Sequence, residues 1–159
     1  MIILGIDPGL QVCGYAVVEH KLLDTKLIEA GVFRTDGKAE LAARLNQIAD
    51  DIEQVLKTHQ PDTVAVEQLY SHYNHPRTAI LMGHARGVIF QKAAASGASV
   101  RDFAATRIKK SLTGNGRATK SQMQLSIQSV LGLPEPPEPA DVADAIAIAL
   151  CCASENKNL

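Results

Sequence analysis

The stretch IILGIDPG, residues 2–9, is an almost wholly apolar run that closes on an acid and a Pro-Gly turn. Such a short run is typical of a central strand covered on both faces of a sheet. Residues 63–67 (TVAVE) repeat the pattern, because a β-branched run again ends in a carboxylate. The sequence therefore predicts two buried strands that carry Asp7 and Glu67 at their tips.

The rest of the chain predicts three further strands and five helices. Strands are expected over residues 14–19 and 26–34, as in an antiparallel meander, and over residues 99–103. Apolar periodicity predicts helices over residues 38–58, 78–95, 104–112, 119–131 and 140–153. This order predicts one α/β domain over residues 1–159, with helices flanking a mixed five-stranded sheet whose first three strands are antiparallel.

Composition excludes several classes of protein. A chain of 159 residues that is 46% hydrophobic can bury a core, which excludes disorder and fibrous repeats. No stretch of the sequence approaches the roughly 18 consecutive apolar residues of a membrane helix, and the first residues lack the basic and then apolar order of a secretory signal. We therefore expect a cytoplasmic protein without a membrane partner. Cys13, Cys151 and Cys152 lack the spacing of a zinc cage or a disulfide framework, which predicts buried thiols.

Charge is segregated along the chain, although the formal net charge is only −1. Residues 1–67 hold 6 basic and 11 acidic side chains, whereas residues 68–120 hold 9 basic side chains against Asp102 alone. A segment this basic predicts a surface that binds phosphates, with a solvated helix surface as the alternative.

Asp141 and Asp144 add two more acids at the start of the last expected helix, where a spacing of three places both on one side. If this helix start crosses the tips that carry Asp7 and Glu67, four carboxylates share a small volume, and their repulsion calls for cations. Mg²⁺ or Mn²⁺ suit such oxygen ligands, and a pair of ions about 3.5 to 4 Å apart supports phosphoryl chemistry. Taken singly, each acid could instead serve a turn or a helix N-terminus.

Five motifs resemble those of the RuvC family of bacterial Holliday junction resolvases in order and spacing. They are GIDPG with Gly14, VEQLY, GHARGV, GNGRATKSQ and ADVADAIAIA, at residues 5–14, 66–70, 83–88, 114–122 and 140–149. The resemblance implies a ribonuclease H-like fold, a homodimer and Mg²⁺-dependent paired nicking of four-way junction DNA in recombination and repair. It also implies a branch-migration helicase as partner, 5′-phosphate and 3′-hydroxyl ends, and two metal ions per site.

The resemblance and the basic segment together assign candidate residues. The catalytic and metal-binding acids implied are Asp7, Glu67, Asp141 and Asp144, with Lys120 as a catalytic cation near the scissile phosphate. DNA contacts are expected from Tyr70, Tyr73, Arg77, Lys109, Lys110, Arg117 and Lys120, with Tyr70 stacking on an unpaired base. The helix of GHARGV implies a dimer interface at Gly83, Ala85, Arg86 and Gly87. Residues 71–77 (SHYNHPR) depart from the family's usual run, which leaves the cleavage-sequence preference open.

Alternative functions remain at this point. A glycine-rich turn after a strand Asp also resembles the phosphate loop of actin-like ATPases and sugar kinases, although these need two such domains. A junction-binding protein without activity would keep the basic segment, and a related nuclease could prefer RNA or another branched DNA. His72, His75 and His84 form a possible zinc cluster, but solvated or phosphate-contacting histidines fit their spacing better.

Overall fold

The computed structural model describes residues 1–22, 24–69 and 76–155. Its elements follow the predicted order and are β1 (Ile2–Asp7), β2 (Val12–Lys21), β3 (Asp24–Arg34), α1 (Leu41–His59), β4 (Thr63–Glu67), α2 (Pro76–Ala95), β5 (Ser99–Phe103), α3 (Ala105–Thr113), α4 (Lys120–Leu131) and α5 (Ala140–Glu155). No helix in these ranges is both long and apolar enough to cross a membrane.

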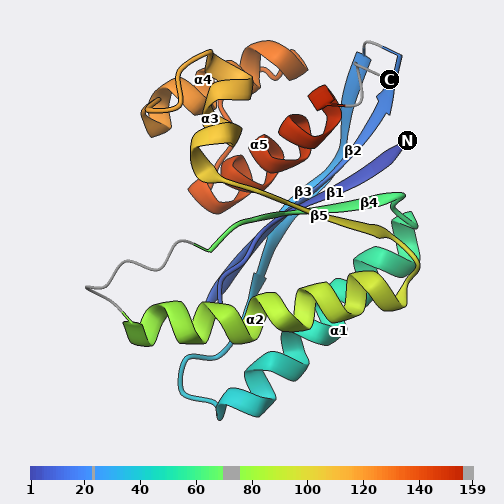
Figure 1. The fold of residues 1–159 in the computed structure, drawn as a ribbon, viewed down its shortest axis with the longest axis vertical. Helices are drawn as coiled ribbons and strands as arrows, with labels where there is room; N and C mark the ends of the chain where they lie inside the picture. The colour runs from blue at the N-terminus through green and yellow to red at the C-terminus, as the bar shows by residue number, and fades with distance from the viewer. Residues whose placement is uncertain (23, 70–75, 156–159) are drawn as a thin grey trace.

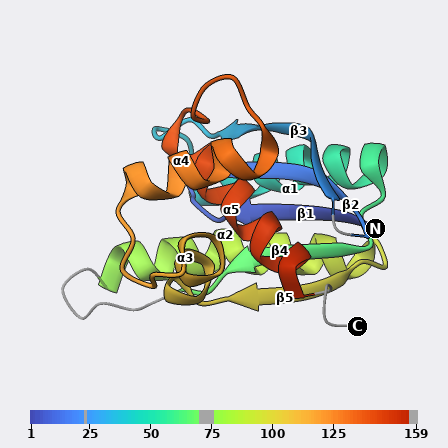
Figure 2. The same ribbon diagram turned by 90° about the horizontal axis from the view of Figure 1, so that it is seen from above.

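The sheet has five strands in the order β3-β2-β1-β4-β5, which Figure 2 shows from above. β1 pairs with β2, and β2 with β3, in antiparallel fashion, whereas β1 pairs with β4, and β4 with β5, in parallel. The predicted mixed sheet with three antiparallel strands at its start is therefore confirmed. Because β1 and β4 are parallel neighbours, their carboxyl ends lie at the same edge of the sheet.

Helices cover both faces of the sheet, as Figure 1 shows: α1 and α2 lie on one face, and α3, α4 and α5 on the other. α1 is amphipathic and buries Ile48, Ile52, Val55 and Leu56 against the sheet. It starts at Leu41 and not at residue 38, because a turn at Asp36 accepts hydrogen bonds from the main-chain N–H groups of Lys38 and Ala39.

α5 is the central helix of the other face. From Val142 to Ala153 every side chain except that of Asp144 is buried. The helix approaches β1 closely because Gly5 has no side chain: a Cβ there would lie 2.3 Å from the main-chain oxygen of Ala145. This close contact seats the middle of α5 directly on β1.

Alternation along β1 and β4 decides which face receives the terminal acids. In β1, Leu4 and Ile6 pack in the core shared with α1 and α2, whereas Ile3 packs in the core shared with α5. Since neighbouring residues of a strand point to opposite faces, Asp7 shares the face of Ile3. The same parity in β4 places Glu67 on the α5 face, together with Ala65. Both acids therefore emerge on the face that α5 covers.

Candidate active site

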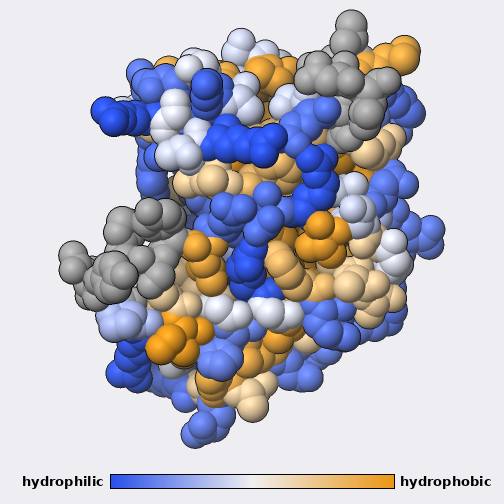
Figure 3. Space-filling model, viewed as in Figure 1, coloured by the Kyte–Doolittle hydropathy of each residue, from blue (hydrophilic) through white to orange (hydrophobic). Residues whose placement is uncertain are grey.

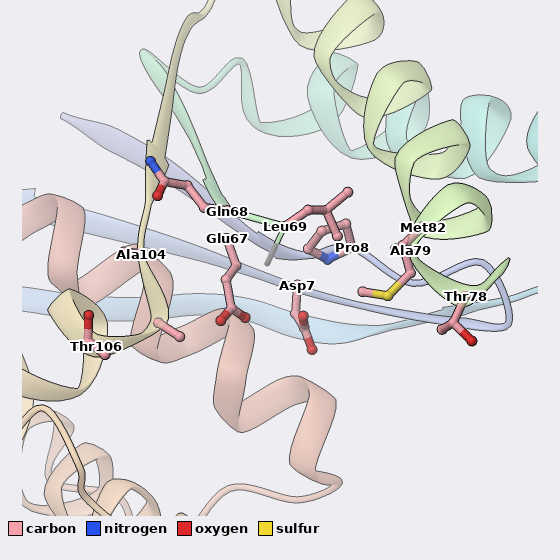
Figure 4. A pocket seen from close by; sticks show the side chains of 11 residues that line it. Asp7, Pro8, Glu67, Gln68, Leu69, Thr78, Ala79, Met82, Ala104 and Thr106 are labelled. Carbon is pink, nitrogen blue, oxygen red and sulfur yellow. The ribbon is translucent and has the colours of Figure 1, made fainter. Parts of the chain in front are cut away.

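Asp7 and Glu67 end adjacent parallel strands and lie beside one another. Figure 4 shows their carboxylates pointing the same way, toward the ribbon of α5. They line a cleft of about 740 Å³ whose other walls come from the end of β4, the start of α2 and the start of α3. The lining also includes Pro8, Gln68, Leu69, Thr78, Ala79, Met82, Ala104, Ala105 and Thr106.

The start of α5 lies against the strand beside Asp7. In the antiparallel ladder Asp7 pairs with Gly14 of β2. A Cβ at Gly14 would lie 2.0 Å from the main-chain oxygen of Asp141 and 3.2 Å from its Cβ. Only a glycine allows this approach, so the glycine of the GIDPG motif region seats the first turn of α5, with Asp141 and Asp144, next to the tip of β1.

The electrostatics of Asp7 show that the four acids converge. Burial, followed by the negative charges of Asp144, Glu67 and Asp141 in that order, raises the pKa of the Asp7 carboxyl to about 7 against the opposing charge of Lys120. A carboxyl group with a pKa near 7 is unusual, and such shifted values are typical of functional sites. Acids from two strands and one helix therefore lie near enough to Asp7 for their charges to act on it.

Glu67 and Asp144 feel the same environment. Burial raises the pKa of the Glu67 carboxyl, the charge of Asp144 adds to this, and Lys109 opposes it. Burial likewise raises the pKa of Asp144; Lys120 lowers it, Asp141 raises it and Lys109 lowers it. Burial outweighs Lys109 at Glu67 and both lysines at Asp144, so the site disfavours the negative charge of these two carboxylates.

Lys109 and Lys120 bring positive charge close to these carboxylates. With Glu67 and Asp144 they line a second pocket of about 180 Å³. Lys120 is the first residue of α4, directly after a capping box in which the Thr119 hydroxyl accepts from the Gln122 main-chain N–H and the Gln122 side chain accepts from the Thr119 N–H. This cap fixes where α4 starts and hence where Lys120 emerges.

The donor set matches a hard divalent cation in its chemistry. Four carboxylates supply the oxygen atoms that Mg²⁺ and Mn²⁺ prefer, and the raised pKa values show that a positive charge would relieve repulsion there. Within residues 1–22, 24–69 and 76–155, no three His, Cys, Asp or Glu side chains come close enough together to hold a metal as they stand. Carboxylates that repel one another are expected to close up only around a cation.

The other predicted DNA-binding residues are exposed or lie outside the described ranges. Arg77 is exposed in the first turn of α2, Lys110 is exposed on α3, and Arg117 is exposed in the turn before α4. Figure 3 shows hydrophilic side chains running through the middle of the face in view, with hydrophobic patches on either side. Tyr70 and Tyr73 lie outside the described residues.

Of the three histidines of the possible zinc cluster, the described residues include His84. His84 is exposed on α2. His72 and His75 lie outside the described residues, so a zinc site there stays untested. The three cysteines are buried, as the sequence predicts.

The expected dimer interface on α2 needs one correction. Gly83 and Gly87 are exposed to solvent, but Ala85 is fully buried in the core that α2 shares with the sheet. Ala85 points inward because it lies a helical half-turn from the exposed positions, so its side chain is not available to a partner. Arg86 is engaged within its own chain, where it pairs with Asp102.

The sequence analysis identifies the acids of the cleft but not its apolar lining. Leu69 follows the end of β4, two positions after Glu67, and Met82 lies on α2 across the cleft (Figure 4). Their only sequence signal is apolar character beside a strand-end acid, which a core residue shares. Which apolar residues border the cleft depends on how α2 meets the end of β4.

Comparison with known proteins agrees with this geometry. The family model of crossover junction endodeoxyribonuclease RuvC matches residues 3–152. The enzyme of that name from Rhodopirellula baltica is 53% identical over 149 residues, which cover 94% of this chain and 84% of that protein. The structure of Thermus thermophilus RuvC superposes with a TM-score of 0.90 at 31% identity, covering 99% of this chain and 97% of that one.

A second Thermus thermophilus structure, RuvC in complex with Holliday junction substrate, superposes with a TM-score of 0.92 at 32% identity and covers 99% of this chain and 96% of that one. Sequence and fold thus agree over nearly the whole chain, and the match includes the strand-end acids, the start of α5 and the helices that carry the two lysines. By these measures the chain belongs to the crossover junction endodeoxyribonuclease RuvC family.

Proposed function

We propose that this chain resolves Holliday junctions by paired, symmetric hydrolysis of phosphodiester bonds, leaving 5′-phosphate and 3′-hydroxyl ends. The observation that carries the proposal is the convergence of Asp7, Glu67, Asp141 and Asp144 beside Lys109 and Lys120, in a family one of whose members has been solved with Holliday junction substrate. Such ends can be religated, which fits a role in recombination and repair.

The four carboxylates would hold Mg²⁺, two ions per site, with Mn²⁺ able to substitute. When bound, these ions would lower the pKa of water and neutralise charge on the phosphate and the leaving oxygen. The raised pKa of Asp7 supports this assignment, because burial and three neighbouring acids disfavour its ionised form, and a bound cation would offset both effects.

The two lysines supply the chain's own positive charge. Lys120 and Lys109 line the pocket that also contains Glu67 and Asp144. An ammonium group is a compact donor, so the Lys120 Nζ can donate hydrogen bonds to phosphate oxygens as negative charge develops there. Lys109 on α3 is placed to bind the same backbone and hold it in the site.

Binding of the junction would extend from this site over the exposed basic residues. Arg77, Lys110 and Arg117 are exposed on elements next to it, and Tyr70 and Tyr73 belong to the segment that joins β4 to α2. We propose contacts from these side chains to phosphates and splayed bases. Shape and phosphate contacts would then select the junction, with base preference as a smaller contribution.

A homodimer would present two such sites to a four-way junction. An isologous pair places identical sites in symmetric positions, which suits paired nicks in opposed strands. Gly83 and Gly87 are exposed on α2 and have no side chains that would keep a second copy away. We further propose that residues 1–159 act as one nuclease domain in the cytoplasm, next to a branch-migration helicase.

A labelled four-way junction tests this function. With Mg²⁺, we expect symmetric nicks in two opposed strands, and ligase should reseal the products. Asp7→Asn should reduce nicking on the order of a thousandfold, because one anionic ligand is lost, while junction binding persists. Asp24→Asn, an exposed acid at the start of β3, serves as the matched control and should nick normally.

Two outcomes would contradict the proposal. Wild-type protein that binds the junction with Mg²⁺ or Mn²⁺ but leaves every strand intact would be a junction-binding protein without nuclease activity. Unchanged nicking by Asp7→Asn would remove Asp7 from the catalytic set. A preference for RNA or for three-way DNA, measured in parallel, would keep the chemistry and change the substrate.

A further inference from the structure

Arg86 joins three parts of the molecule that meet behind the active site. Its Nε donates a hydrogen bond to the main-chain carbonyl oxygen of Glu67 at 3.3 Å, and its Nη2 donates to Asp102 Oδ2 at 2.8 Å. The guanidinium also lies over the ring of Phe90, 4.2 Å from its centroid. One side chain of α2 thereby contacts the last residue of β4 and the neighbouring strand β5.

Glu67 pairs with Phe103 of β5 but lies just beyond the end of the pairing between β4 and β1. The register of β1 with β4 ends at the pair Ile6–Val66, one residue before Glu67. On the other side, the Gln68 main-chain N–H donates to the Phe103 oxygen at 2.9 Å. The Arg86 hydrogen bond is therefore the contact that holds the Glu67 carbonyl beyond the end of the β1 ladder.

Arg86 reaches this carbonyl from the face opposite the active site. The carboxylate of Glu67 emerges on the α5 face, whereas Ala85 and Val66 pack in the core on the α2 face. Asp102 pairs in register with Val66 and so belongs to the α2 face as well. Arg86 therefore contacts the backbone of Glu67 without entering the cleft that would hold the substrate.

Asp102 orients the guanidinium of Arg86 through their ion pair. It is the single acid among residues 68–120, and it lies opposite the guanidinium that also contacts Glu67. The side chain of Arg86 is only 20% exposed, so the pair is partly shielded from water. An arginine fork can bridge a carboxylate and a carbonyl at once, whereas the single ammonium of a lysine cannot match that geometry.

We propose that Arg86 is a positioning residue that fixes the carboxylate of Glu67 through its main-chain carbonyl, and that Asp102 holds Arg86 in place for this role. Small displacements of a catalytic group can lower a rate by roughly a hundredfold. The activity part of the proposal rests on the function proposed above. The structural part does not, because it concerns only how the ends of β4 and β5 are held.

Two variants disrupt the contacts of Arg86 with Glu67 and Asp102 in different ways. Arg86→Lys keeps the positive charge but loses the fork, and Asp102→Asn keeps the shape but loses the charge that holds the guanidinium. Lys92→Met is the matched control, because Lys92 also forms an ion pair from α2, with Glu53, and lies toward the far end of the helix. Sedimentation of each variant at equal concentration reports its oligomeric state.

The kinetic readout separates positioning from binding. Single-turnover nicking of a junction by Arg86→Lys should be slower by roughly tenfold to a hundredfold at saturating protein, with junction affinity within about twofold of wild type. Asp102→Asn should show a smaller loss of the same kind, and Lys92→Met none. A loss confined to affinity, or a wild-type rate for Arg86→Lys, would overturn the proposal.

Amide hydrogen exchange tests the same idea without any nuclease activity. If Arg86 holds the end of β4, the Gln68 amide should exchange faster in Arg86→Lys and Asp102→Asn, while amides in the middle of β4 keep their protection. Unchanged exchange at Gln68, or a monomeric Arg86→Lys with normal Gln68 protection, would assign Arg86 to another role. If wild type fails to nick junctions, the exchange result still decides the structural part.

Discussion

The two faces of the sheet are built differently. On one face, aliphatic side chains of α1 and α2 pack against the strands. The outer side of these helices carries exposed ion pairs, such as that of Glu53 with Lys57. On the other, α5 is buried along most of its length and approaches the strands so closely that Gly5 and Gly14 leave no space for a Cβ. All four carboxylates converge on this second face.

This difference shows where the molecule gives up stability for function. An amphipathic helix with a solvated outer side tolerates small shifts, because its charged side chains stay in water when the helix moves. A buried helix that carries two acids to two further acids cannot relax in the same way, so the repulsion is held in place by packing. Stability and catalysis should therefore be linked on the α5 face and separable on the α1–α2 face.

The largest effect should come from Asp7 in protein stripped of divalent cations. Its pKa is about 7 in the folded chain against an ordinary value of 3.8, so the folded state binds the proton more tightly than the unfolded state. The free energy of unfolding should then fall as pH rises from about 4 to 7 and level off above that. The Asp7 contribution is on the order of 4 kcal/mol.

Urea unfolding with a chelator at pH 5 and pH 8 measures this contribution. Asp7→Asn cannot ionise, so it should lose less stability than wild type between the two pH values and be the more stable protein at pH 8. Asp24→Asn should follow wild type. An Asp7→Asn variant with the same pH dependence as wild type would show that the folded state tolerates the charge, and the contrast between the two faces would lose its electrostatic basis.

The next effect should come from filling the contact between β1 and α5. In Gly5→Ala the new Cβ would meet the Ala145 oxygen at 2.3 Å and the Ala149 Cβ at 2.8 Å, and the helix backbone would have to move. We expect a loss at or above the upper end of the roughly 1 to 3 kcal/mol typical of overpacking, together with slower nicking. Thermal unfolding and single-turnover nicking measure the two losses.

Gly37→Ala provides the control for this substitution. A Cβ at Gly37 would meet no described atom within 4 Å, so the same chemical change should leave stability and rate close to wild type. A Gly5→Ala protein that loses stability but nicks at the wild-type rate would show that the start of α5 keeps its place when its middle moves. The link between packing and chemistry would then fail on the α5 face.

The sequence predicts much of this design from local patterns. The apolar runs that end at Asp7 and Glu67 predict both the strands and the edge at which their acids meet, and the order of elements predicts the mixed sheet. Asp141 and Asp144 follow from helical spacing. These features depend on neighbouring residues alone, so one sequence suffices to find them.

Features that depend on how elements meet could not be found in this way. The inward direction of Ala85 depends on the rotation of α2 about its axis, and the bridge from Arg86 to Glu67 and Asp102 joins three elements. Gly14 is part of a recognisable motif, but its physical reason, the contact with Asp141, is 127 positions away along the chain. Periodicity alone specifies none of these distances.

The smallest effect should come from the core beneath α1, which supplies no residue of the candidate site. Ile52 of α1 is fully buried in the core beside α2, and Ile52→Val removes one methylene there. We expect a loss of about 1 kcal/mol in the free energy of unfolding, because the core closes only partly around the missing group. Nicking measured well below the melting temperature should keep its wild-type rate, since no site residue rests on Ile52. A rate that falls in proportion to the lost stability would show that both faces move together, and would remove the distinction between them.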